Sequence, residues 1–193
     1  MLTRMYGGEL DPYCYPGTIV LINRLGTTDQ SILNAFEAEM TSQRAADPLP
    51  IGRLSYTHYR AIHRHFFQDV YAWAGRIRTV RMSKGSSEFC YPENIDREMR
   101  RLFGGLTAQK HLRGLDARKF AEKAAHFLAE LNAIPFREGN GRMQLAFLAI
   151  LAERAAHPLK LQHLDPTAML AAMIASFRGD EAPLAGIIVG LVR

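Results

Sequence analysis

The chain has 193 residues, of which 48% are hydrophobic and 22% charged, and its net charge is +5. We predict a single domain over residues 1–193, because this length accommodates one sizeable core. The basic residues are scattered, which argues against a nucleic-acid-binding protein. Cys14 and Cys90 are too few for a disulfide framework, and no apolar run is long enough to span a membrane. We therefore expect a cytoplasmic protein, or one secreted by a route that uses no signal peptide.

Helical patterns cover most of the chain. Thr27, Thr28 or Asp29 can cap a first helix, and Ser55 opens a second one that runs through Gln68. Further helices are predicted at Asn94 to Leu106, at Phe120 to Ala133, from Asp165 onward, and from about Pro183 to Val192. Residues 145–152 are all apolar, which indicates a helix in the middle of the core.

Residues 77–91 carry the one alternating pattern in the sequence. Ile77, Thr79 and Arg81 alternate with the residues between them, as in a strand. Residues 83–87 supply a turn, and residues 88–91 a second short strand. The predicted fold is therefore all-α with one β-hairpin at residues 77–91.

A third feature is the run Glu138-Gly-Asn-Gly-Arg142 between two predicted helices. Gly139 and Gly141 can take positive φ, which lets consecutive backbone N–H groups point into one concavity. The N-terminus of the next helix and the Arg142 guanidinium add positive charge, so these parts form a phosphate cradle. Glu138 beside polyphosphate then calls for a cation, and Mg²⁺ favours one or two carboxylates plus substrate phosphates. Taken alone, Gly-Asn-Gly is as compatible with a plain turn.

Three histidines lie on the second predicted helix. His58, His63 and His65 show no i, i+4 spacing, so a metal pair on one helix face is not expected. We expect them at surface or helix-packing positions.

The stretch from Ile134 to Leu145 resembles the signature of the Fic proteins, His-x-Phe-x-(Asp/Glu)-Gly-Asn-Gly-Arg-x-x-Arg. Phe136 and every residue from Glu138 to Arg142 match it. The signature His falls on Ile134, and the second Arg falls on Leu145. Residues 15–18 (Tyr-Pro-Gly-Thr) and 71–75 (Tyr-Ala-Trp-Ala-Gly) also resemble family segments. The resemblance thus spans most of the chain.

Most Fic proteins transfer AMP from ATP to a hydroxyl side chain of another protein. The resemblance implies a Fic-type helical bundle, with residues 77–91 as a flap on which the target protein docks, and a motif loop at residues 134–142. It also implies ATP and Mg²⁺ as ligands. The resemblance implies Glu138 for the metal and a nucleotide site at Gly139, Asn140, Gly141 and Arg142. The implied catalytic positions are Asn140 and Ile134, where the base is missing.

Ile134 decides what activity to expect. The signature His accepts the proton of the target hydroxyl, and isoleucine has no lone pair with which to do so. We therefore expect a chain that binds nucleotide and transfers AMP very slowly or not at all.

Other functions stay open at this stage. The chain could be a non-catalytic regulator that binds nucleotide or a partner, an interaction module without nucleotide, or a toxin or effector held by a small antitoxin-like protein. Residues 176–181 approach the inhibitory motif of the family but place Asp180 where the motif has Glu. Leu145 also removes the arginine that would receive that Glu, so inhibition by this motif is not expected.

Overall fold

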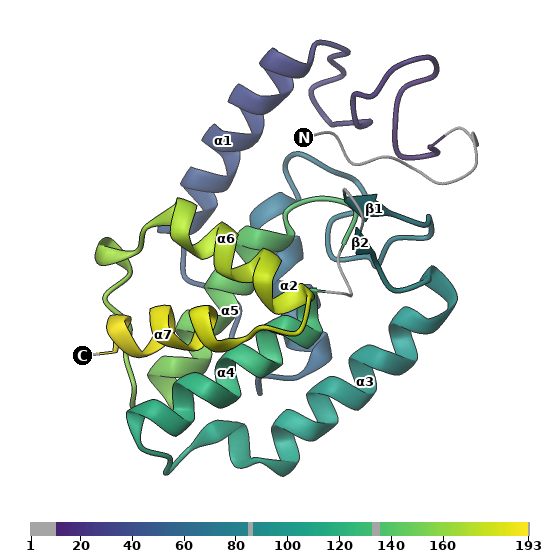
Figure 1. The fold of residues 1–193 in the computed structure, drawn as a ribbon. Coiled ribbons are helices and arrows are strands. Elements are labelled where there is room, and N and C mark those ends of the chain that lie inside the picture. Colours follow the sequence, from purple (N-terminus) through teal and green to yellow (C-terminus); the bar gives the residue numbers. More distant parts are fainter. Residues whose placement is uncertain (1–10, 85–86, 133–135, 193) are drawn as a thin grey trace.

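The computed structural model describes residues 11–84, 87–132 and 136–192. Ile134, the position of the signature base, lies outside the described residues. The described part contains seven α-helices, two short 3-10 helices and one two-stranded antiparallel sheet (Figure 1). The α-helices are α1 (Gln30–Ala46), α2 (Tyr56–Phe67), α3 (Pro92–Ala108), α4 (Ala117–Asn132), α5 (Asn140–Arg154), α6 (Pro166–Phe177) and α7 (Ala182–Leu191). The remaining elements are β1 (Ser83–Lys84), β2 (Ser87–Glu88), η1 (Lys110–Leu112) and η2 (Leu161–His163).

Helix starts follow the sequence signals. The Asp29 carboxylate accepts the N–H groups of two first-turn residues of α1, and the Ser55 hydroxyl accepts one of α2. The Asp165 carboxylate does the same for α6, and Pro92 occupies the first turn of α3. Each cap satisfies N–H groups that have no partner inside the helix. The prediction of an all-α protein, with these helices in this order, is confirmed.

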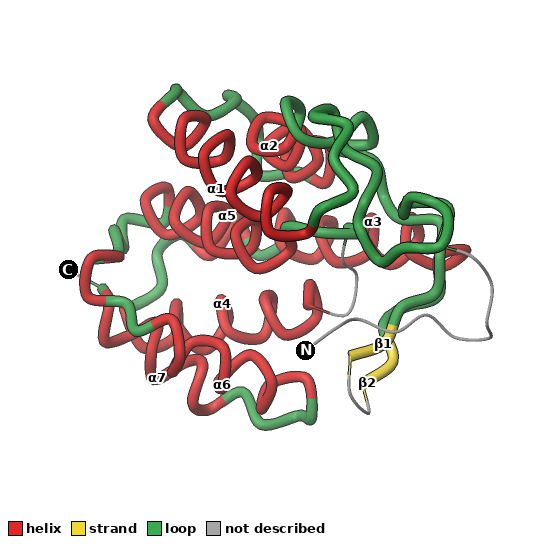
Figure 2. The backbone as a smooth tube through the Cα atoms, turned by 90° about the horizontal axis from the view of Figure 1, so that it is seen from above, coloured by secondary structure: helices red, strands yellow, loops and turns green. Residues whose placement is uncertain are grey.

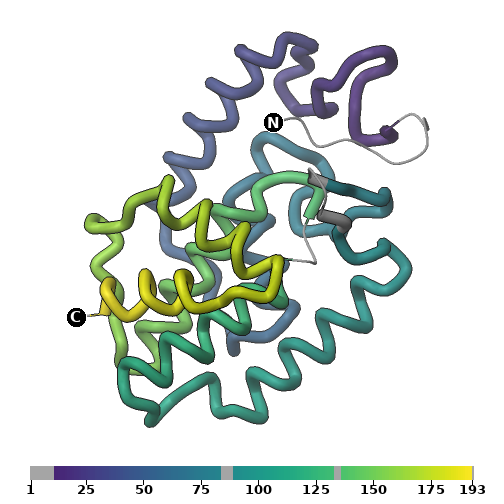
Figure 3. The backbone as a smooth tube through the Cα atoms, in the orientation of Figure 1, coloured from purple at the N-terminus to yellow at the C-terminus, as the bar shows by residue number. Residues whose placement is uncertain are grey.

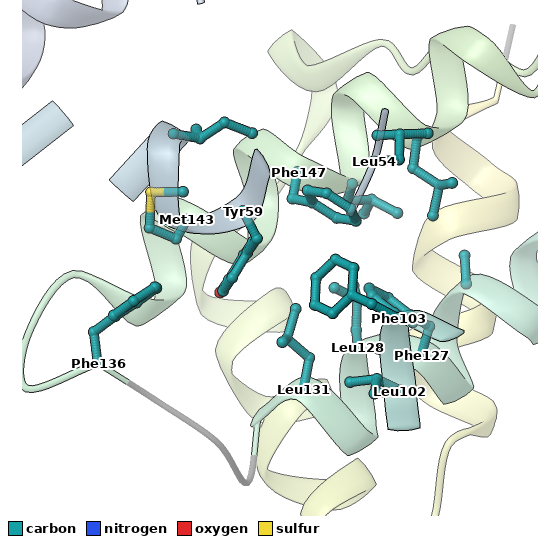
Figure 4. Close-up of a cluster of buried hydrophobic side chains, with 14 of the residues drawn as sticks. Leu54, Tyr59, Leu102, Phe103, Phe127, Leu128, Leu131, Phe136, Met143 and Phe147 are labelled. Carbon is teal, nitrogen blue, oxygen red and sulfur yellow. The ribbon is translucent and has the colours of Figure 1, made fainter. Parts of the chain in front are cut away.

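α5 occupies the middle of the molecule, as its apolar run predicted. No residue from 143 to 152 is exposed. Phe147 of α5 meets Tyr59 of α2, Phe103 of α3 and Phe127 of α4, with ring centroids 5.4–5.7 Å apart (Figure 4). Aromatic pairs at this separation add to the stabilisation from area burial. The cluster ties α2, α3 and α4 around α5 and so fixes the place where α5 begins.

α1 is much less buried than the other long helices. Only Leu33 and Thr41 of its 17 residues are buried. In Figures 1 and 3 the helix extends away from the body of the protein, and Figure 2 shows it on the same side as α2. A helix with so little buried apolar surface depends on a few specific contacts for its position.

The C-terminal helices α6 and α7 pack against α4 on the side away from α2 (Figure 2). The apolar side chains of α6 lie only partly in the core, because Met173 is buried whereas Leu170 and Ile174 are 54% and 46% exposed. No helix of the described residues is long and apolar enough to cross a bilayer.

The hairpin is much shorter than predicted. Ser83 pairs with Glu88 and Lys84 with Ser87. The strands therefore lie mostly within residues 83–87, which were expected to form the turn. Residues 77–82 do not form the expected first strand. Arg78 explains why, because its buried guanidinium donates to the carbonyl oxygens of Val80 and Cys90. These carbonyls are satisfied by a side chain instead of a strand ladder. Burial lowers the pKa of Arg78 to about 10.

Candidate functional site

The predicted cradle lies where the chain leaves α4 and enters α5. Gly139 is the N-cap of α5 and has a φ of +81°, in the left-handed region, as predicted. A Cβ at this position would lie 2.3 Å from Cζ of Phe67, closer than any real contact. The backbone conformation and the neighbouring ring therefore both require glycine here.

Gly141 differs from the prediction. It lies in the first turn of α5 and is not among the glycines with positive φ. A Cβ there would meet nothing within 4 Å. The N-cap of α5 makes no side-chain hydrogen bond, so the first N–H groups of the helix remain for a ligand. Gly141 thus leaves room beside these donors, which is the arrangement of an anion site at a helix N-terminus.

The motif loop is held by its own side chains. Phe136 is 2% exposed and stacks on Tyr59 with ring centroids 5.4 Å apart. The Asn140 amide bonds to both backbone groups of Phe136: Nδ2 donates to the Phe136 carbonyl oxygen at 2.8 Å, and Oδ1 accepts the Phe136 N–H. Arg137 forms an ion pair with Asp11 at 2.7 Å, and both side chains are about a tenth exposed. The Asn140 side chain therefore shapes the loop in this structure, where the resemblance implied a contact with the phosphates.

Arg142 has partners that the sequence analysis did not predict. Its guanidinium donates to the Glu37 carboxylate and, at 3.2 Å, to the Thr41 hydroxyl, both on α1. It also lies over the Phe67 ring, 4.8 Å from the centroid. Glu37 in turn accepts the Tyr71 hydroxyl at 2.5 Å. The pair is only partly shielded, because the Arg142 side chain is 42% exposed and that of Glu37 14%.

Two carboxylates act on the Tyr71 phenol. Burial raises the pKa of Tyr71, and the charges of Glu37 and Glu138 raise it further, which places both acids near the phenol. Oε1 of Glu138 accepts the Gly139 N–H at 2.8 Å. The described residues contain no cluster of three or more His, Cys, Asp and Glu that could hold a metal ion by themselves. A Mg²⁺ ion at Glu138 would therefore have to take its other ligands from phosphates and water.

Sequence reasoning also missed the place of His63. The ring is fully buried and contacts both the motif loop and the segment after α2. One signal was present, because His63 follows Ile62 and precedes Phe66 and Phe67 on the apolar face of α2. Nothing in the sequence alone indicated Glu37, which is one of two acidic residues on a largely exposed helix.

The comparisons with known proteins agree with this geometry. Residues 53–152 match the Fic/DOC family. The chain is 54% identical over 185 residues to a probable protein adenylyltransferase, y4lH, of Sinorhizobium fredii, covering 95% of this chain and 96% of that protein. The chain therefore belongs to the Fic/DOC family.

Solved structures show the same fold. The Bartonella effector protein BepC from Bartonella tribocorum, with bound AMPPNP, superposes with a TM-score of 0.83 at 25% identity, covering 94% of this chain and 96% of BepC. The N-terminal Fic domain of a putative cell filamentation protein from Bartonella quintana, with bound ADP, gives 0.84 at 26% identity and covers 94% of each chain. Both relatives were solved with an adenine nucleotide or its analogue.

Proposed function

We propose that this protein binds ATP together with Mg²⁺ at residues 138–142 and that its transfer of AMP to protein hydroxyl groups is very slow or absent. The observation that carries the proposal is the N-terminus of α5, which has no side-chain cap and has open space at Gly141. Triphosphate oxygens accept hydrogen bonds from such N–H groups, and the helix dipole favours their charge. Bound AMPPNP and ADP in the related structures support an adenine nucleotide as the ligand.

Glu138 and Arg142 have separate proposed roles, one toward the metal and one toward the phosphates. Glu138 would hold Mg²⁺, which neutralises phosphate oxygens beside its carboxylate. Arg142 keeps donors that its contacts with Glu37 and Thr41 do not use, because a guanidinium carries five N–H groups. Its exposed edge can therefore donate to a phosphate.

Loss of Arg142 tests the phosphate site directly. We expect Arg142→Ala to weaken MgATP binding by about 1.5–3 kcal/mol in titration calorimetry, because a charge-assisted hydrogen bond to phosphate is removed. Arg118→Ala is the matched control, since Arg118 is exposed at the far end of α4 and pairs with Glu122. Equal ATP affinity in Arg142→Ala and the parent protein would show that the cradle lies elsewhere.

Glu37 gives a second test with the opposite sign. The carboxylate competes with phosphate for the guanidinium, so Glu37→Gln is expected to tighten MgATP binding by about two- to fivefold, in line with a partly exposed ion pair. Glu39→Gln is the control, because Glu39 carries the same charge on α1 but bonds to Gln43. Weaker binding in Glu37→Gln would mean that Glu37 holds Arg142 in place for the phosphate.

We also propose that residues 77–91 receive the target protein. β1 and β2 form a sheet of only two strands, and an extended segment can add to a sheet by strand pairing. Alternatively, the same residues could bind a regulatory partner, with no AMP transfer taking place. The +AMP mass shift on a target, measured beside target binding, distinguishes the two.

A further inference from the structure

His63 connects two segments that are far apart in the sequence. The Gly75 N–H donates to Nδ1 of His63 at 2.9 Å, and Nε2 lies 3.1 Å from the carbonyl oxygen of Glu138. The side chain is completely buried, with its ring centroid 3.9 Å from that of Phe136 and 4.7 Å from that of Phe67. Both nitrogens therefore bond to backbone groups inside the protein.

These contacts determine the tautomer. A backbone N–H can only donate, so Nδ1 must be the acceptor and the ring proton must be on Nε2. Nε2–H then donates to the Glu138 carbonyl. Burial, assisted by the charge of Arg142, lowers the pKa of His63 to about 4, and the ring is neutral near pH 7.

The consequence concerns a single peptide group. The carbonyl of Glu138 and the N–H of Gly139 belong to the same planar trans unit, so they point in opposite directions. His63 holds the carbonyl on the core side. The N–H therefore points the other way, where it meets the Glu138 carboxylate at 2.8 Å.

We propose that His63 is a positioning residue of the nucleotide site, which sets the orientation of the Glu138–Gly139 peptide and through it the place of the Glu138 carboxylate. The inference rests on the proposed function for its binding readout. An apolar residue of similar size would fill the space and leave two buried backbone groups without partners.

The same ring anchors the segment that precedes the hairpin. Gly75 has a φ of +79°, and a Cβ there would lie 2.9 Å from Cβ of Arg64, so its backbone lies directly against α2. Nε of Arg60 donates to the Gly75 carbonyl at 2.9 Å. His63 thus accepts a hydrogen bond from the Gly75 N–H, and Arg60 donates one to the Gly75 carbonyl. The motif loop and the segment at Gly75 are therefore both positioned by side chains of α2.

Two substitutions separate the contacts of the ring. His63→Gln places an amide nitrogen near the position of Nε2, so it keeps the donor to Glu138 and loses the acceptor for Gly75. His63→Asn places an amide oxygen near Nδ1 and does the reverse. We expect His63→Asn to lose about tenfold or more in MgATP affinity, as supporting residues of ligand groups do, whereas His63→Gln stays near the parent value. Thermal unfolding of both variants shows whether stability accounts for the difference.

Two measurements on nucleotide-free protein keep this test separate from the proposed function. Hydrogen exchange at residues 136–142 should accelerate in His63→Asn and not in His63→Gln. The ¹⁵N shifts of His63 in the parent protein should show a protonated Nε2 and a bare Nδ1, which requires no variant. A parent protein that binds no ATP defeats the proposed function alone. A protonated Nδ1, or equal loss of affinity and exchange protection in both variants, would overturn the positioning role.

Discussion

Replacing Ile134 by His is expected to raise AMP transfer by about tenfold or more, because general-base catalysis contributes about 10²–10⁴ in rate. A target hydroxyl is too weakly acidic to ionise near pH 7, and an imidazole with an ordinary pKa can accept its proton during attack on the α-phosphorus. The ATP site is expected to be present in the unmodified chain, so the substitution supplies the missing step. Adding Leu145→Arg restores the second signature arginine and should not lower the rate.

Neither His63 nor His126 can take over this role. His63 is buried with both nitrogens bonded, and His126 is exposed on α4 beside Glu181. Transfer is measured as a +AMP mass shift on a protein substrate or on the chain itself. Ile134→Asn is the control, because it adds a polar group of low basicity at the same position. Robust transfer by the unmodified chain, at a rate that Ile134→His does not exceed, would contradict the proposal.

Gly139 and Gly141 are expected to respond to alanine in opposite ways. Gly139→Ala should destabilise the fold, because a left-handed alanine costs about 1–2 kcal/mol and overlap with the Phe67 ring costs about 1–3 kcal/mol more. Gly141→Ala places its methyl group in open space on a helix, so it should gain about 0.5–1 kcal/mol of stability.

Nucleotide binding separates the variants further. The Gly141→Ala methyl group would occupy the space that a phosphate needs, and we expect MgATP affinity to fall by about tenfold, or about 1.4 kcal/mol, in a protein that is more stable than the parent. Chemical denaturation gives the stability and calorimetry the affinity. A Gly141→Ala variant that is stable and binds ATP as tightly as the parent would show that the N-terminus of α5 is not part of the nucleotide site.

Sequence reasoning predicted most of the fold. Helix starts at Ser55 and Asp165, and one within residues 27–29, were predictable because a capping side chain acts on N–H groups two or three residues away. The central position of α5 followed from a run of residues that are apolar on every face. The hairpin was predicted too long, because alternation at residues 77–82 says nothing about where the Arg78 side chain goes.

The same limits apply to the site. The sequence by itself determined the Gly139 conformation, since few residues other than glycine adopt positive φ. It also determined that position 134 supplies no general base, since isoleucine has no basic atom. Only the tertiary structure decided that Glu37 pairs with Arg142 and that His63 bonds to Glu138. These partners are 105 and 75 residues apart in the chain. Their contacts depend on how α1 and α2 pack beside α5, which is a property of the whole core that no local pattern encodes.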